Sequence, residues 1–160
     1  EGLESDTFEI TCDENLIRAT VGADSLWVRP IDGEYPDYRR VIPAKLPHVA
    51  KVSKKDLLQS LKIMLALVSE RSKVVTFEFT KSQLVLSTNN PDKGEASDRI
   101  PVKYNGADMK TGFNVNFFLD ALSNLDGDEI EIEVGEKLQP ALLKSAENPG
   151  YLIVVMPMRI

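Results

Sequence analysis

The sequence is short of the residues that build disulfides and metal centres. Its 160 residues include one cysteine, Cys12, and one histidine, His48. A single cysteine cannot close an internal disulfide, and no cysteine or second histidine stands near His48 to suggest a set of metal ligands. We therefore expect no metal site and no cofactor. A reducing cytoplasm is the compartment that fits best.

Long apolar runs and targeting signals are also missing. No hydrophobic run approaches the roughly 18 residues needed to cross a bilayer, and the start lacks the pattern of a signal peptide. A membrane location is therefore not expected. The chain opens with Glu1 and not with Met, which suggests that an upstream part of the protein is absent.

Signatures of catalysis are lacking as well. The sequence has no glycine-rich phosphate loop and no nucleophile elbow. Glu129, Glu131 and Glu133 share one face of a predicted strand. Such a row would suit a carboxylate-based hydrolase, but it more simply keeps a sheet surface solvated. We expect no catalytic residues, with hydrolysis as the enzymatic alternative.

Charge is spread unevenly over the chain, whose formal net charge is -6. Residues 1–43 carry 4 basic and 10 acidic side chains, residues 44–72 carry 6 and 2, and residues 73–160 carry 9 and 13. A protein that coats nucleic acid with its whole surface is therefore disfavoured. The basic segment either faces an anionic partner or simply keeps a helix soluble.

Residues 1–35 alternate between apolar and polar side chains with a period of two, which predicts three short antiparallel strands. A meander of this size buries too little apolar surface to be stable alone. We therefore predict that it is the end of an upstream domain, with Cys12 in the core. The apolar face consists of Phe8, Ile10, Cys12, Ile17, Ala19, Val21, Leu26 and Val28.

Prolines and a glycine mark residues 36–43 as an extended linker, so a domain of residues 44–160 should follow. Ser53-Lys54-Lys55-Asp56 resembles a capping box and predicts a helix to about Glu70. At about 100° per residue, Lys55, Gln59 and Lys62 lie opposite the apolar stripe of this helix. The stripe consists of Leu57, Leu58, Leu61, Met64, Leu65 and Val68.

The remaining sequence predicts a repeated unit. Strands are expected at about 73–80, 83–88 and 97–104, with a turn at Asn89-Asn90-Pro91-Asp92. Another strand leads to a helix after Asn116, which ends at Asp126-Gly127, and strands follow near 129–134, 139–145 and 151–158. Strand, helix and three strands therefore occur twice. This pattern predicts an α+β fold, a doubled β-α-β-β-β unit with two helices packed on one face of antiparallel sheet.

Several motifs, in their order and spacing, closely resemble the bacterial β sliding clamp, the β subunit of DNA polymerase III. They are Tyr35-Pro36-Asp37-Tyr38-Arg39-Arg40-Val41-Ile42-Pro43, Asn89-Asn90-Pro91, Gly112-Phe113-Asn114-Val115 and Val154-Val155-Met156-Pro157-Met158-Arg159. The resemblance covers essentially the whole chain, from the last strands of the middle clamp domain (1–35) through the linker (36–43) to the third domain (44–160). It implies the DNA-clamp fold and a non-catalytic processivity factor, a head-to-tail homodimer ring that encircles duplex DNA.

The resemblance further implies a hydrophobic peptide cleft between the second and third domains. There the polymerase catalytic subunit, the clamp loader and repair proteins would insert short linear motifs. Helical spacing supports part of this, because Phe117 lies about 100° from the stripe centred on Phe118, Leu119 and Leu122. Met156 and Met158 have an alternative role, packing an edge strand on its own core. The implied cleft residues are Pro36, Arg40, Val41, Asn114, Phe117, Leu138, Pro140, Val154, Met156, Pro157, Met158 and Arg159.

By the same resemblance, Lys55 and Lys62 would face DNA phosphates without reading sequence. The polar face of the second helix carries no base, which limits its share of such contact. The subunit contact would lie at the end of the first helix, unless Ile63 and Leu67 pack under a neighbouring strand. Its residues would be Ile63, Ala66, Leu67 and Val68. A peptide-binding adaptor that does not encircle DNA is the alternative function.

Two departures from the family pattern concern peptide affinity. Phe117 stands where family members commonly have Tyr, which removes a hydroxyl, and an aromatic residue after the first helix is replaced near Ser72. Peptide affinity should differ accordingly.

Overall fold

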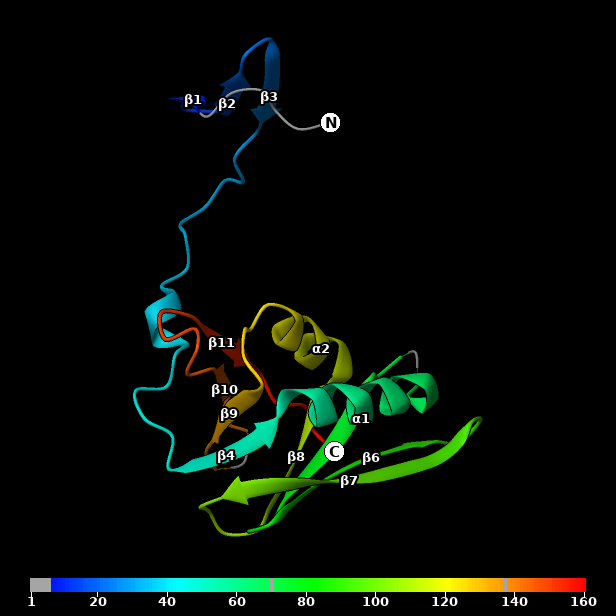
Figure 1. Ribbon diagram of the computed structural model, residues 1–160. Helices are drawn as coiled ribbons and strands as arrows, with labels where there is room; N and C mark the ends of the chain where they lie inside the picture. Colours follow the sequence, from blue (N-terminus) through cyan, green and yellow to red (C-terminus); the bar gives the residue numbers. More distant parts are fainter. Residues whose placement is uncertain (1–6, 70, 137) are drawn as a thin grey trace. The chain divides into compact units, whose positions relative to one another are not determined.

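The computed structural model describes residues 7–69, 71–136 and 138–160. They belong to two compact units, Glu1–Asp37 and Tyr38–Ile160 (Figure 1). Glu70, the predicted end of the first helix, lies outside the described residues.

The first unit is a three-stranded antiparallel sheet of β1 (Glu9–Asp13), β2 (Leu16–Val21) and β3 (Asp24–Val28). Its register pairs Cys12 with Ile17 and Ile10 with Ala19, so the predicted apolar face does assemble. No described residue of this unit is buried, however, and Cys12 is exposed. Among the described residues no second layer covers the apolar face of this sheet, so the placement of Cys12 in the core of a larger domain stays a prediction.

The predicted extended linker contains a short helical turn. A 3-10 helix, η1 (Tyr38–Arg40), opens the second unit, and the Val41 N–H donates to the Tyr38 carbonyl oxygen at 3.0 Å. Pro36 and Pro43 bracket a stretch too short for a longer helix, and 3-10 turns suit such short connectors.

The second unit confirms the predicted doubled fold. All neighbouring strands pair antiparallel in one eight-stranded sheet of order β11-β10-β9-β4-β7-β6-β5-β8. The last two strands are shorter than predicted. The first copy is β4 (His48–Ser53), α1 (Lys54–Leu67), β5 (Val74–Phe79), β6 (Gln83–Asn90) and β7 (Gly94–Tyr104); the second is β8 (Met109–Asn114), α2 (Val115–Ser123), β9 (Glu129–Val134), β10 (Ala141–Lys144) and β11 (Leu152–Val155).

Both helices lie on the same face of the sheet and enclose the core between them and the strands (Figure 1). Phe77 of β5 is at the centre of this core, with ring centroids 5.1 Å from Phe113 of β8 and 4.6 Å from Phe118 of α2. All three rings are buried. Because aromatic side chains bury large areas in well-defined geometry, this cluster attaches α2 firmly to the sheet.

The apolar stripe of α1 is narrower than predicted. Leu57, Leu61 and Met64 are fully buried, but Leu58 is only partly buried and Leu65 is 39% exposed. Including Leu65 in the stripe was therefore wrong. Leu65 follows Met64 by one residue, which turns its side chain about 100° away from the sheet.

Side-chain caps set the start of each helix. The Ser53 hydroxyl accepts the Asp56 N–H at 3.3 Å, as the predicted capping box requires. The Asn114 side chain accepts the Asn116 N–H at 3.0 Å, so α2 begins at Val115, earlier than predicted. The Lys54 ammonium donates to the Leu125 carbonyl and thereby links the start of α1 to the residues after α2.

The Asn-Asn-Pro motif fastens the end of α1 to the sheet. Asn89 and Asn90 belong to β6, and the turn itself comprises residues 91–93. Asn90 is buried; its side-chain amide donates to the Leu67 carbonyl oxygen at 3.0 Å and accepts the Asp92 N–H at 3.0 Å. It therefore satisfies a carbonyl that the last turn of α1 leaves without a helical partner.

The sheet curls until its two edge strands are linked. Beyond β11, Met158 forms an isolated antiparallel bridge with Gly112 of β8, and its N–H donates to the Gly112 carbonyl oxygen at 2.7 Å. The carboxyl-terminal residues therefore cross from one edge of the sheet to the other.

Lysines on neighbouring strands pair with the glutamate row of β9. Lys51 of β4 lies 2.6 Å from Glu131 and 4.0 Å from Glu129, and Lys144 of β10 lies 2.6 Å from Glu133. The hydrogen bond to Glu131, together with its charge, raises the pKa of Lys51 above 10.5, and Glu129 adds a smaller attraction. Cross-strand pairing supports the structural interpretation of this row over the hydrolase alternative.

We expect Asn90→Ala to lower the free energy of unfolding of the second unit by about 1–3 kcal/mol, because it leaves buried hydrogen-bonding groups unsatisfied. Urea unfolding would measure the loss. The matched control is Asn89→Ala, which removes an amide bonded to Glu95 on the exposed surface and should cost less than about 0.5 kcal/mol. Equal losses would show that Asn90 does not fasten α1.

We expect Glu131→Gln to bring the pKa of Lys51 down toward 10.5, because it removes the carboxylate that contributes most to the shift. Glu129→Gln should lower it less. A raised lysine pKa stabilises the fold below 10.5, and this contribution disappears as the pH rises through the folded-state pKa. An NMR titration of lysine side chains would measure both variants, and an unchanged Lys51 pKa in Glu131→Gln would contradict the assignment.

Candidate functional site

An apolar groove runs between α2 and β11, within the second unit. It has a volume of about 410 Å³ and opens to solvent. One wall comes from an exposed side of α2, and the other comes from β11 and the residues on either side of that strand. The lining residues are Phe117, Asp120, Ala121, Asn124, Tyr151, Ile153, Val154, Val155 and Met156.

The rotation of α2 about its axis gives the groove its aromatic residue. Val115, Phe118, Ala121 and Leu122 of the helix face the core. Phe117 is adjacent to Phe118 in sequence and therefore points about 100° away, which leaves 56% of it exposed. Helical spacing predicts this exposure of Phe117. A large exposed aromatic side chain in a concave apolar surface is typical of a recognition site.

The opposite wall is an edge strand followed by a methionine. Among the strands of the described residues, β11 pairs only with β10, and its other edge lies beside α2. Val154 is half-buried, and Met156 is 55% exposed, so the interpretation of Met156 as a core residue is not supported. Methionine is flexible and polarizable, which suits a groove that accepts partners of different shape.

The structure brings together three of the predicted cleft residues, Phe117, Val154 and Met156, as lining of one groove. Pro157 and Met158 are half-buried where the chain leaves the groove for β8, and Arg159 is exposed beyond them. Asn114 does not line the groove; its side chain caps the start of α2.

The other predicted cleft residues lie on loops and on the connecting segment. Leu138, exposed and with φ of 69°, and Pro140, half-buried, belong to the loop between β9 and β10. Ala141 pairs with Val155, so the antiparallel register brings Pro140 level with Met156. Arg40 ends η1, and Val41 follows it as an exposed residue. Pro36 belongs to the other compact unit.

Sequence reasoning missed several groove residues. Asp120, Ala121 and Asn124 lie at positions i+3, i+4 and i+7 from Phe117, so the helical period that singled out Phe117 also predicts them. Asn124 is held by hydrogen bonds from its amide to the Asp120 carbonyl oxygen at 2.8 Å and the Ser123 hydroxyl at 3.2 Å. Tyr151 carried no comparable signal, because its position depends on the pairing of β10 with β11.

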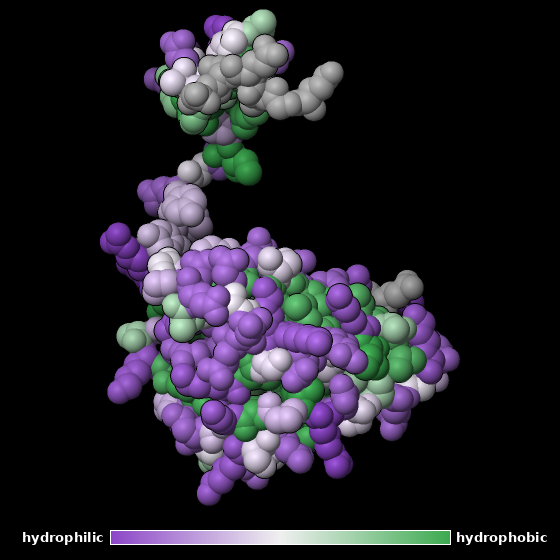
Figure 2. Space-filling view, in the orientation of Figure 1, coloured by the Kyte–Doolittle hydropathy of each residue, from purple (hydrophilic) through white to green (hydrophobic). Residues whose placement is uncertain are grey.

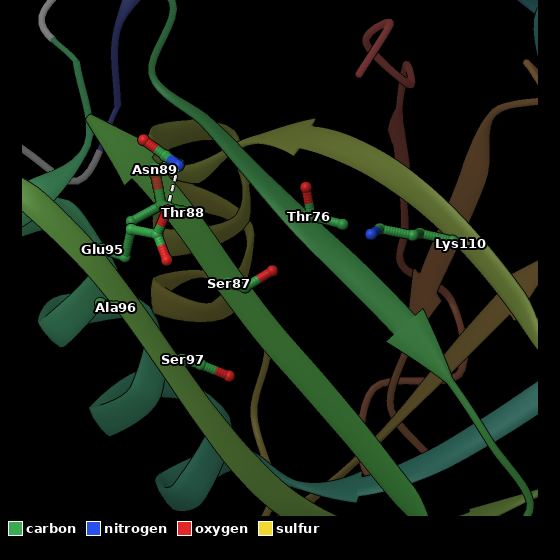
Figure 3. A pocket seen from close by; sticks show the side chains of 8 residues that line it. All are labelled: Thr76, Ser87, Thr88, Asn89, Glu95, Ala96, Ser97 and Lys110. Carbon is green, nitrogen blue, oxygen red and sulfur yellow. Dashed lines mark hydrogen bonds between the residues drawn. The ribbon is translucent and has the colours of Figure 1, made fainter. Parts of the chain in front are cut away.

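Most of the residues that line a second concavity, of about 430 Å³, have polar or charged side chains (Figure 3). It lies over β5, β6, β7 and the start of β8, and Figure 3 shows Thr76 and Lys110 directed toward each other and the Asn89 amide bonded to Glu95. Few apolar side chains reach it. The groove beside α2 is therefore the better candidate for binding an apolar peptide. Its lining residues are Thr76, Ser87, Thr88, Asn89, Glu95, Ala96, Ser97 and Lys110.

The predicted DNA-facing lysines lie on the open side of α1. Lys55 and Lys62 are exposed, together with Gln59, opposite the fully buried Leu57 and Leu61. The structure thus orients both ammonium groups away from the core. Lys51 and Lys54 are engaged within the fold, so the net charge of the basic segment overstates the number of lysines available to a partner.

The carboxyl end of α1 exposes apolar surface (Figure 2). Ile63 is 45% exposed, Ala66 is exposed and Leu67 is half-buried. The alternative that Ile63 packs under a strand is therefore not supported. Val68, predicted as part of the same surface, is buried in the core, because it continues the stripe that begins at Leu57.

Residues 7–69, 71–136 and 138–160 offer neither a cluster of metal ligands nor a membrane-spanning helix. These residues contain no group of three or more His, Cys, Asp or Glu side chains that could hold a metal ion. His48 lies in β4, with its ring centroid 6.0 Å from that of Tyr104. Within the same residues, neither helix combines the length and apolarity needed to cross a membrane.

Comparison with known sequences identifies relatives along nearly the whole chain. Residues 39–159 match the family described as DNA polymerase III beta subunit, C-terminal domain. The beta sliding clamp of Proteus mirabilis is 31% identical over 100% of this chain and 44% of its own length. That of Escherichia coli K12 is 35% identical over 91% of this chain and 40% of its own length. The chain thus spans less than half of these relatives.

The solved structures that resemble this chain include further sliding clamps. A DNA polymerase sliding clamp from Pseudomonas aeruginosa, crystallised with a ligand, has a TM-score of 0.87 at 29% identity, over 96% of this chain and 42% of its own. The sliding clamp of Bartonella birtlesii bound to griselimycin has a TM-score of 0.87 at 30% identity, over 94% and 41%. The fold, the motifs and the match over residues 39–159 together show that this chain belongs to the DNA polymerase III β subunit family, the bacterial sliding clamps.

Proposed function

We propose that the protein to which this chain belongs is a processivity factor in DNA replication. It encircles duplex DNA as a head-to-tail homodimer ring in the cytoplasm and tethers the polymerase catalytic subunit, the clamp loader and repair proteins. In this proposal residues 1–35 end the middle clamp domain, residues 36–43 are the linker and residues 44–160 are the third domain. The chain itself carries no catalytic role.

The groove beside α2 is the observation that carries this proposal. Its exposed Phe117 and Met156, which lie together in one apolar groove, are suited to anchoring apolar side chains of a short peptide. The other predicted cleft residues complete the proposed site, with Pro157, Met158 and Arg159 beyond Met156 and with Leu138 and Pro140 on the adjoining loop. Pro36, Arg40, Val41 and Asn114 are proposed to contribute from the linker and from the start of α2.

The open side of α1 is the proposed DNA-facing surface. Lys55 and Lys62 would attract phosphates without reading bases, and a ring that holds DNA by its topology needs only such weak contacts. The polar side of α2 carries no base, so α1 would supply most of this attraction in the domain.

The exposed apolar end of α1 is the proposed subunit contact. Ile63, Ala66 and Leu67 would be covered by the neighbouring subunit of the ring, since exposed apolar patches often mark interfaces. Val68 would support this surface from beneath, because its own side chain is buried.

We expect Phe117→Ala combined with Met156→Ala to weaken peptide binding to the full-length protein at least about tenfold, because truncating two anchors removes more than about 1.4 kcal/mol. The ligand is a fluorescent peptide from the carboxyl tail of the polymerase catalytic subunit, and anisotropy measures its Kd. The control is Leu65→Ala, an exposed apolar truncation on α1 outside every proposed site. Unchanged affinity in the double variant would reject the groove as the peptide site.

We expect the full-length protein to stay on closed circular DNA after loading and to leave once the circle is cut. Lys55→Glu with Lys62→Glu should reduce retention more at low salt than at high salt, because salt screens exposed charges. Gel filtration of loaded circles measures retention.

The matched control is Lys81→Glu with Lys103→Glu, the same charge change at exposed lysines outside α1. If both pairs behave alike at every salt concentration, the lysines of α1 serve solubility only. If circular and linear DNA are released equally, the protein is an adaptor that does not encircle DNA.

A further inference from the structure

We propose that Gly112 is a positioning residue that sets the separation between the two walls of the peptide groove. Its role is to leave space for the carboxyl-terminal residues 156–160 to cross β8. This inference rests on the proposed function of the groove, but its structural part can be tested separately.

Gly112 is linked to both walls of the groove. Along the chain it lies two residues before Asn114, the cap of α2, and α2 carries Phe117 in its first turn. Through space it accepts the Met158 N–H at 2.7 Å, two residues beyond Met156 of the other wall. The bridge between Gly112 and Met158 therefore joins the two walls beside the groove.

The absence of a side chain at this position is what permits the crossing. A Cβ added at Gly112 would overlap the Cγ2 of Ile160 and would lie 3.0 Å from the Met158 carbonyl oxygen and 3.1 Å from the Cγ1 of Val74. Gly112 is buried and is not among the residues with positive φ. Glycine is thus required here for space and not for backbone freedom.

Pro157 transmits any displacement to the groove. It lies between Met156 and Met158, and its ring fixes φ near -65°, so the backbone here has little freedom to absorb a shift. If a side chain at position 112 moves Met158 away from β8, Met156 moves as well. The wall opposite Phe117 then changes position although no lining residue has been altered.

We expect Gly112→Ala in the full-length protein to speed amide hydrogen exchange at Met158 at least about tenfold and to weaken binding of the polymerase-tail peptide about tenfold. Adding Ile160→Ala should partly restore the slow exchange at Met158 and the peptide affinity, because it removes the nearest overlapping group. Ile160→Ala alone should change little. The control is Gly150→Ala, where an added Cβ meets nothing within 4 Å.

The outcomes separate the two claims. Wild-type exchange and affinity in Gly112→Ala would overturn the positioning role. If the wild type does not bind the peptide but amide exchange at Met158 still speeds up in Gly112→Ala, the proposed function of the groove is rejected. The coupling between residues 156–160 and β8 is then still supported. If Gly112→Ala alone does not fold, the same measurements in the Ile160→Ala background decide, because the 3.0 Å approach to the Met158 carbonyl remains there.

Discussion

Burial of Phe118 against Phe77 and Phe113 is the contact on which the arrangement of the second unit depends. It fixes α2 both on the sheet and in rotation about its own axis. Once Phe118 is in the core, its neighbour Phe117 must lie outside, and the residues three, four and seven positions later line the same surface. The groove is thus a consequence of how the core is packed, and its lining requires no strained backbone.

Helix α1 is fixed by a different set of contacts. Its buried stripe packs on the sheet, Lys54 links its start to Leu125, and Asn90 binds the Leu67 carbonyl at its end. With both ends held, one side of the helix presents Lys55 and Lys62 and its last turns present Ile63 and Leu67. Polar contacts at the two ends therefore determine where a charged surface and an apolar surface are available to partners.

Charge in this chain serves two separate purposes. Lys51 and Lys144 neutralise glutamates across neighbouring strands and stabilise the sheet surface, whereas Lys55 and Lys62 have exposed side chains on α1. Counting charges by segment cannot distinguish these roles, because pairing between β4 and β9 joins residues about eighty positions apart. The glutamate row of β9 illustrates the same point, because its structural role depends on lysines that neighbouring strands bring beside it.

The doubled order of strands and helices, the capping of α1 by Ser53 and the exposure of Phe117 could all be predicted from the sequence, because periodicity and capping are local properties. The tertiary structure, in contrast, sets the exposure of Leu65 and the burial of Val68 in the core. It alone brings β11 beside α2 and Met158 onto Gly112. Such contacts depend on strand order and sheet curvature. These arise from the packing of the whole unit and cannot be inferred from any short stretch of sequence.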